Sequence, residues 1–348
     1  MRLWTPRKQS QTTGKATHSM STSTSASLPG PDAPASLGPA HHAHATMHCN
    51  LNSTAIERSA AFHMAVFGLE PRMRSVSVGI DATSMGLSDD TASVTTFLYD
   101  LRGPRAAPAL ELVGWSRPPT EQARPEHRPC GFTAIGYRVA SLGIIKARLA
   151  ALGIASVPVP GGLPVRGEAR PALRITDPDG VIFEVVEIAP AATDPRRVAL
   201  LSHERMRCTD LDRTMGWYEK IGWRVRDRGT GPGGAPTASL VLPEDPTFSL
   251  EFEQLAVPAG ATRTRAANTR GLYRIALAVD DVHAAYASLA AEGSVVGAFG
   301  RPLTPVTLSM PDTPTGGFTV LFLADPDGAV VELVERPRSA VRRPAEPS

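Results

Sequence analysis

The chain contains an internal repeat, and this feature limits the folds it can adopt more than any other. Residues 177–188 read DPDGVIFEVVEI, and residues 325–336 read DPDGAVVELVER. Each copy is a DPDG turn followed by an apolar run with one glutamate at the same offset, Glu184 in the first and Glu332 in the second. This shared pattern indicates that one structural unit occurs twice.

The repeat also extends upstream of the two turns. His48 and His203 each open a segment with an arginine ten residues later, an aromatic residue fourteen residues later and then a closing glycine. Further on, GFTAIGYRVASLGIIKARLAALG from Gly131 matches GLYRIALAVDDVHAAYASLAAEG from Gly271. Both stretches change from strand-like alternation to an apolar face at helical spacing. Each repeat is therefore predicted to hold two strand–helix–strand–strand–strand halves, an α+β fold.

These landmarks divide the chain into predicted domains, with helices in the first repeat near 55–67 and 141–152. The predicted parts are a disordered leader over 1–45, domain one over 46–190, a linker over 191–200, domain two over 201–336 and a disordered tail over 337–348. The leader is rich in Ser, Thr, Ala, Pro and His and has almost no acidic residues, a composition typical of disorder.

Composition excludes several classes of protein. No apolar run approaches the ~20 residues of a membrane span. The net charge is +2 and aromatic residues make up 5% of the chain, which disfavours a nucleic-acid partner. The three cysteines are widely spaced and form no CxxC pair. That pattern favours a reducing compartment, so we expect a cytoplasmic protein without a membrane partner.

These coupled motifs resemble the vicinal oxygen chelate (VOC) superfamily, which includes glyoxalase I, extradiol dioxygenases, and fosfomycin and bleomycin resistance proteins. The resemblance covers about 280 residues. It implies tandem βαβββ modules, four in all, forming two cup-shaped mixed sheets with the helices outside. Metal and substrate, when present, would lie inside a cup.

The resemblance also implies which residues face the metal. In glyoxalase-like members four positions converge: the start of the opening strand, a glutamate in the fourth strand, a histidine opening the second half, and the glutamate after DPDG. In this chain the four positions are His48, Glu111, Ala134 and Glu184 in the first repeat, and His203, Glu251, Arg274 and Glu332 in the second. The third position departs from the pattern in both repeats. Because extradiol dioxygenases use two histidines and one glutamate, this departure weakens the transfer of their chemistry.

Strand alternation provides a check on this assignment, since successive side chains point to opposite faces. In FSLEFEQ the apolar residues share one face and Glu251 takes the other. In LYRIALAV, Tyr273 begins the apolar face and Arg274 points into the cup. Glu332 shares its inward face with two valines. The predicted phases therefore agree with the ligand positions.

The first repeat is predicted to bring His48, Glu111 and Glu184 together. One nitrogen and two carboxylates with open positions suit a divalent metal ion such as Fe, Mn, Zn, Ni or Co. The alternative is a protonated His48 paired with both carboxylates and no metal.

In the second repeat a guanidinium stands at the third position, which makes a metal less favoured there. Arg274 is predicted to bridge Glu251 and Glu332, replacing a metal site by a salt bridge. Glu332, like Glu184 in the first repeat, is the candidate catalytic base.

Three arginines are candidate substrate-binding residues of the second repeat. Arg205, Arg207 and Arg274 would suit a carboxylate- or phosphonate-bearing ligand. The alternative is that they pair with the neighbouring glutamates 253, 251 and 332.

Two functions follow from these observations. The first is a metal-dependent enzyme, a lyase or isomerase of the glyoxalase kind or an oxygenase, acting on a small oxygenated metabolite. The second is a metal-free protein that binds and sequesters a small molecule, as bleomycin resistance proteins do. The retained His48, Glu111 and Glu184 favour the first, and the missing second histidine favours the second. With four modules in one chain, either a monomer or a homodimer is compatible with two complete cups.

Overall fold

The computed structural model describes residues 39, 41–122, 130–188, 199–256, 264–293, 296–300 and 304–343. All of these residues belong to one compact unit, Gly38–Ser348. Most of the predicted leader (1–38 and 40), most of the predicted linker (191–198) and the end of the predicted tail (344–348) lie outside the described residues. Within the described part, no helix is long and apolar enough to cross a membrane.

Both ends of the described chain pack against the fold, which corrects the predicted boundaries of leader and tail. The backbone N–H of Ala43 donates to the carbonyl of Ile221 at 2.9 Å. Near the other end, the buried Arg343 guanidinium is 3.0 Å from the carboxylate of Asp245, which is also buried. The polar composition of these segments is typical of disorder. Composition alone does not reveal that their polar groups form hydrogen bonds and ion pairs with residues elsewhere in the chain.

Four βαβββ modules follow one another along the chain, as the repeat predicts. The first comprises β1 (Ala45–Asn52), α1 (Ile56–Phe67), β2 (Glu70–Ile80), β3 (Thr91–Tyr99) and β4 (Ala109–Arg117). The second comprises β5 (Gly131–Val139), α2 (Leu142–Ala151), β6 (Val157–Pro158), β9 (Ala172–Thr176) and β10 (Ile182–Glu187), with a hairpin of β7 (Leu163–Val165) and β8 (Glu168–Arg170) inserted. The third comprises β11 (Leu200–Cys208), α3 (Leu211–Lys220), β12 (Arg224–Thr230), β13 (Pro236–Leu242) and β14 (Asp245–Gln254). The fourth comprises β15 (Gly271–Val279), α4 (Val282–Glu292), β16 (Val296–Gly297), β17 (Val306–Ser309), β18 (Gly317–Ala324) and β19 (Val330–Glu335).

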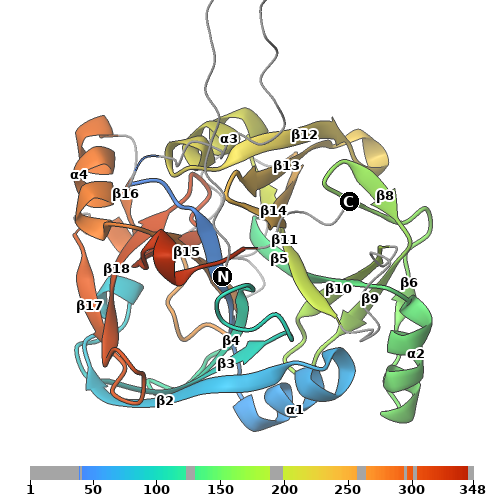
Figure 1. The fold of residues 1–348 in the computed structure, drawn as a ribbon, viewed down its shortest axis with the longest axis horizontal. Helices are drawn as coiled ribbons and strands as arrows, with labels where there is room; N and C mark the ends of the chain where they lie inside the picture. Colours follow the sequence, from blue (N-terminus) through green and yellow to red (C-terminus); the bar gives the residue numbers. More distant parts are fainter. Residues whose placement is uncertain are drawn as a thin grey trace, which may run out of the picture. The chain divides into compact units, whose positions relative to one another are not determined.

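The two large sheets each combine modules from both repeats. One sheet has the order β16-β18-β19-β15-β1-β4-β3-β2, with β17 paired to β18, and so joins the first and fourth modules (Figure 1). The other has the order β12-β13-β14-β11-β5-β10-β9-β6 and joins the second and third. The connecting pairs are antiparallel, β1 with β15 and β5 with β11. The expectation that each repeat closes its own cup is therefore wrong, because alternation within a strand does not specify which strand its free edge will pair with.

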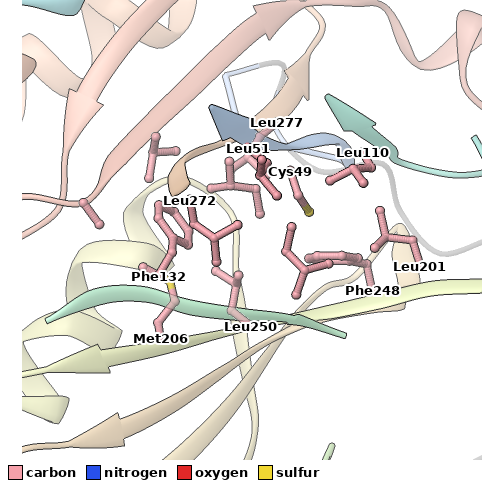
Figure 2. Packing of buried hydrophobic residues seen from close by; sticks show 14 of the residues in the cluster. Cys49, Leu51, Leu110, Phe132, Leu201, Met206, Phe248, Leu250, Leu272 and Leu277 are labelled. Carbon is pink, nitrogen blue, oxygen red and sulfur yellow. The ribbon is translucent and has the colours of Figure 1, made fainter. Parts of the chain in front are cut away.

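An apolar core fills the space between the two sheets. Figure 2 shows Cys49, Leu51 and Leu110 of the first sheet near Phe248 and Leu250 of the second. Since side chains alternate along a strand, burying one face of each sheet here leaves its other face available for polar residues. Those two outer faces carry the candidate site residues.

Each DPDG turn ties the two modules of one repeat together. In the first repeat, Asp179 accepts a hydrogen bond from the backbone N–H of Thr54 at 3.2 Å, just before α1. In the second, Asp327 accepts one from the N–H of Thr209 at 2.9 Å, just before α3. The DPDG turns therefore link the two modules within each repeat, whereas the sheets link one repeat to the other.

A local irregularity corrects one predicted strand phase. Between the pairs Cys49–Ile275 and Leu51–Leu272, β15 contains one more residue than β1, and this extra residue forms a β-bulge. Tyr273 consequently packs with the apolar residues of the cup side, not with the inter-sheet core as alternation predicts.

Candidate functional site

The candidate residues form two clusters, one on the outer face of each sheet. We call the face that carries His48, Glu111, Arg274 and Glu332 the His48 cup, and the face that carries Ala134, Glu184, His203 and Glu251 the His203 cup. Four neighbouring strands, β19, β15, β1 and β4, supply the first set. The predicted trio is thus divided, because Glu184 lies in the His203 cup.

In the His48 cup, a histidine and an arginine lie between two buried carboxylates. Nε2 of His48 is 3.2 Å from Oε2 of Glu111 and 3.3 Å from Oε2 of Glu332. Arg274 donates from Nε to Glu332 at 2.6 Å and from Nη2 to both oxygens of Glu111 at 2.9 and 3.0 Å. The predicted salt bridge from Arg274 to Glu332 is confirmed, but its second partner is Glu111, since Glu251 belongs to the other cup.

Burial and charge pairing determine the protonation of this cluster. Burial would raise the pKa of Glu332, but Arg274 and His48 outweigh it and lower that pKa to about 2. Burial opposes the charge on Arg274 as well, yet Glu111 and Glu332 together raise the pKa of the guanidinium above its ordinary value. Both shifts favour the charged forms of Glu332 and Arg274, so these two form an ion pair, and a carboxylate with so low a pKa is a weak base at neutral pH.

A divalent metal ion, which the family resemblance implies, does not fit these residues. A guanidinium has donors only and cannot ligate a metal. Arg274 occupies the third position and already binds both oxygens of Glu111 and Oε2 of Glu332, which a metal ion would need. Among the described residues, no group of three or more His, Cys, Asp or Glu side chains is arranged to hold a metal ion.

Two atoms of the network remain available to a ligand. Nη1 of Arg274 donates no hydrogen bond to any described residue, and Oε1 of Glu332 accepts none. Both residues line a cavity of about 520 Å³, within the range of small-molecule sites. The cup can therefore offer a ligand one donor and one acceptor.

The wall of this cavity is mainly apolar. Its apolar lining includes Met47, Met73, Phe97, Leu308, Met310 and Phe318. Arg336, which follows β19 in the same alternating phase as Glu332 and Val334, also lines it. Arg336 was not among the predicted site residues, although extending the alternation of Glu332 and Val334 by two residues would have included it.

Asn50 is a second residue of this cup that was not among the predicted site residues. Its side-chain amide donates to Oε2 of Glu111 at 2.9 Å. Asn50 lies two residues after His48 on β1, so it shares the cup face, and this spacing was the available signal.

In the His203 cup, arginines and hydroxyl groups satisfy the carboxylates. Glu184 accepts from Nε of Arg205 at 2.8 Å and from Nη2 of Arg174 at 2.9 Å, and Nε2 of His203 is 3.3 Å away. Burial would raise the pKa of Glu184, but His203 and Arg205 lower it well below its usual range. Of the predicted substrate-binding arginines, Arg205 is thus bound to Glu184.

The other two predicted substrate-binding arginines also have carboxylate partners. Nε of Arg207 is 3.2 Å from Glu253, in a pair that is partly exposed. Arg274 lies in the His48 cup. The alternative of paired arginines therefore describes the geometry, although for two of the three the partners differ from those predicted.

The β7–β8 hairpin occupies the His203 cup. Its two-residue loop, Arg166 and Gly167, has φ values of 54° and 80°, the left-handed pair of a type I′ turn. The backbone N–H of Arg166 donates to Oε1 of Glu251 at 3.0 Å. Leu163 and Val165 are buried against Val186. The hairpin thus supplies the donor and the apolar surface that a ligand would otherwise provide.

His203 is also more enclosed than His48. Its ring lies over Gly136 of the neighbouring strand, where a Cβ atom would be 1.9 Å from Cε1 of the ring. The corresponding neighbour of His48 is Ala276. His203 is fully buried, whereas His48 lines the cavity.

Comparison with solved structures supports the fold. Glyoxalase I from Zea mays is 20% identical over 83% of this chain and 92% of that chain, with a TM-score of 0.56. A putative dioxygenase from Bacillus subtilis subsp. subtilis str. 168 is 12% identical over 84% of this chain and 85% of that chain, also with a TM-score of 0.56. At these identities the likeness shows the fold alone. No curated protein sequence matches the chain significantly.

The family match covers both repeats. The model of the Glyoxalase/Bleomycin resistance protein/Dioxygenase superfamily matches residues 44–185 and 200–333, and so includes both histidines that open a repeat and both glutamates that follow a DPDG turn. The chain therefore belongs to the Glyoxalase/Bleomycin resistance protein/Dioxygenase superfamily.

Proposed function

We propose that the protein binds a small oxygenated molecule in the His48 cup without a metal ion. The observation that carries this proposal is the position of Arg274, whose guanidinium is 2.6 Å from Glu332 and 2.9 Å from Glu111. A buried cation there balances the two carboxylates in the way a metal ion otherwise would. The cavity above it supports binding of a small ligand.

The same cup supports an oxygenated ligand over a hydrocarbon. Nη1 of Arg274 is a free charged donor, and Oε1 of Glu332 is a free charged acceptor. Hydrogen bonds to ionised groups are stronger than those between neutral groups. A hydroxyl or carbonyl group on the ligand would satisfy one or both atoms, and the apolar wall would cover the rest of the molecule.

The second candidate is a metal-dependent lyase, isomerase or oxygenase. Nε2 of His48 lies within 3.3 Å of both carboxylates, and the guanidinium of Arg274 is the group that stands against a metal ion there. Elemental analysis of protein purified without an affinity tag, after dialysis against micromolar Fe, Mn, Zn, Ni and Co, separates the two. We expect far less than one ion per chain. A stoichiometric ion in the wild-type protein would overturn the metal-free proposal.

Arg274→His provides the matched gain-of-function control. It replaces a donor by a possible ligand beside His48, Glu111 and Glu332, so we expect its metal affinity to exceed that of the wild type in a direct titration with Zn²⁺. Thermal unfolding, measured first, shows whether the variant is folded.

Ligand binding is tested with a neutral probe, 2-naphthylmethanol, by calorimetric titration. The partly exposed Leu308 lines the cavity, so Leu308→Trp should place an indole ring in it and weaken binding. Leu152→Trp, at an exposed position outside both cups, should leave binding unchanged. Equal binding by both variants would show that the probe does not occupy the His48 cup.

A further inference from the structure

Arg336 differs from the other arginines of the cavity because it has no acidic partner. Arg72 is paired with Glu70, Arg74 with Glu57, and Arg274 with the two buried glutamates. Arg336 makes no ion pair within the described residues. The unmatched positive charge of the cavity lining is therefore at Arg336.

The guanidinium of Arg336 also contains a buried donor without an acceptor. Its Nε atom is buried and has no hydrogen-bond partner. The backbone of the residue is fixed, since its N–H donates to the carbonyl of Val279 at 2.8 Å and its carbonyl is 2.9 Å from Nε2 of His44. An unpaired buried N–H destabilises the protein. The two Nη atoms of Arg336 also donate to no described residue, and because they are not buried they are the donors that a ligand in the cavity can reach.

The second repeat and the first differ at this position in a way that matches the difference between the cups. Glu332, Val334 and Arg336 correspond to Glu184, Val186 and Ile188 after the two DPDG turns. Ile188 packs against the apolar cluster that holds the β7–β8 hairpin in the His203 cup. Within the described part of the chain, the charged residue thus lines the cavity of the His48 cup, and the apolar one packs with the hairpin in the His203 cup.

We propose that the ligand of the His48 cup is a mostly apolar molecule with one anionic group, and that Arg336 binds this group. The proposal rests on the function proposed above and names its ligand class. A carboxylate or sulfonate fits the planar guanidinium with two parallel hydrogen bonds. The methionine and phenylalanine side chains of the wall accommodate an apolar body of irregular shape.

The test uses three probes that share one ring system: 2-naphthoate, 2-naphthylmethanol and 2-naphthylmethylammonium. Calorimetric titration of the wild-type protein should show the anion binding roughly tenfold more tightly than the alcohol, and the cation more weakly than either. Arg336→Met should remove this preference, so that the anion and the alcohol bind alike. Arg336→Lys, which keeps the charge but lacks the fork of donors, should retain part of it.

Arg72→Met is the matched control, because Arg72 also lines the cavity but is exposed and paired with Glu70. It should change the affinity for 2-naphthoate by less than about threefold. An equal loss in Arg72→Met and Arg336→Met would overturn the specific role of Arg336. Thermal unfolding confirms that each variant is folded, and the Lys variant decides the question if the Met variant is not.

Failure of this inference differs from failure of the proposed function. If the anion and the alcohol bind the wild-type protein equally and Leu308→Trp weakens both, the cup binds ligands but the anionic class is wrong. If none of the three probes binds, or if Leu308→Trp changes nothing, the His48 cup is not the binding site and both proposals fail.

Discussion

The His48 cup and the His203 cup begin from the same pattern of residues and complete it differently. Each has a histidine on its opening strand, a glutamate on the fourth strand of one module and a glutamate after a DPDG turn of the other. In the His48 cup a single buried arginine joins the two glutamates and a cavity remains. In the His203 cup several groups share the carboxylates, and the loop of the β7–β8 hairpin is one of them. Two repeats of one chain can thus share a pattern of residues and still differ in how these residues are paired and in the space left for a ligand.

The largest expected effect comes from removing Arg274, the one arginine that pairs with both buried glutamates of the His48 cup. Arg274→Leu should destabilise the protein by about 3–5 kcal/mol, because it leaves two buried carboxylates facing each other. Arg205→Leu should destabilise it by only about 1–3 kcal/mol, since Glu184 keeps Arg174 and His203. Chemical denaturation measures both. Equal losses would mean that the two networks distribute charge in the same way.

The pH dependence of stability should reveal the same network. The pKa of Glu332 is about 2 in the folded protein and 4.5 without the fold. A lowered pKa means that the stabilisation is complete above pH 4.5 and is lost as pH falls through 2, a difference of about 3 kcal/mol. Denaturation at pH 7 and pH 3 should show about 2 kcal/mol of this loss in the wild type. Glu332→Gln should reduce it, whereas the exposed Glu70→Gln should leave it unchanged.

The buried side chains of the hairpin are expected to contribute more to the free energy of unfolding than the side chains of the cavity wall. Val165 is 1% exposed in the His203 cup, so Val165→Ala should destabilise the protein by about 2 kcal/mol. Leu308 lines the open cavity and is partly exposed, and Leu308→Ala should cost less than about 1 kcal/mol. Thermal unfolding compares them. A greater loss from Leu308 would show that the His48 cup is packed in solution, contrary to the structure.

The smallest effect concerns the space around each histidine. Gly136→Ala should destabilise the protein by about 1–2 kcal/mol, because the added methyl group would displace the ring of His203. Ala276→Ser, beside His48, should be close to neutral. NMR signals of the two imidazole rings would report the change, with His203 shifted and His48 unaffected in Gly136→Ala. A shift of both would indicate that the cups are coupled.

The sequence predicted which residues face the cups better than it predicted which residues meet. Glu111, Glu332 and Arg274 point inward as alternation requires, and Arg274 binds Glu332 as expected. Glu184 was assigned to His48 because both lie in the first repeat, but their strands belong to different sheets. Backbone hydrogen bonds between strands are alike for all residues, so no local pattern distinguishes β5 from β15 as the partner of β1.

Two other features were outside the reach of sequence patterns for physical reasons. The β-bulge that moves Tyr273 to the cup side depends on how β15 meets β1, and thus on tertiary pairing. The place of the β7–β8 hairpin is similar: the turn residues Arg166 and Gly167 indicate a tight loop, but not the cup into which it folds. By contrast, alternation alone extends to Arg336, and a longer reading of the strand would have included it.

The pairing of sheets across the repeats has a consequence for any shortened form of the chain. A fragment covering 41–188 would keep its DPDG tie to Thr54, but β1 and β5 would each lose the antiparallel neighbour that covers one edge. Exposed strand edges associate with other strands, and an identical fragment offers the matching ones. Two such fragments related by a twofold axis would form two equal cups. Each cup would combine His48 and Glu111 of one copy with Glu184 of the other. The His–Glu–Glu trio that is divided in the intact chain would then exist only between two molecules.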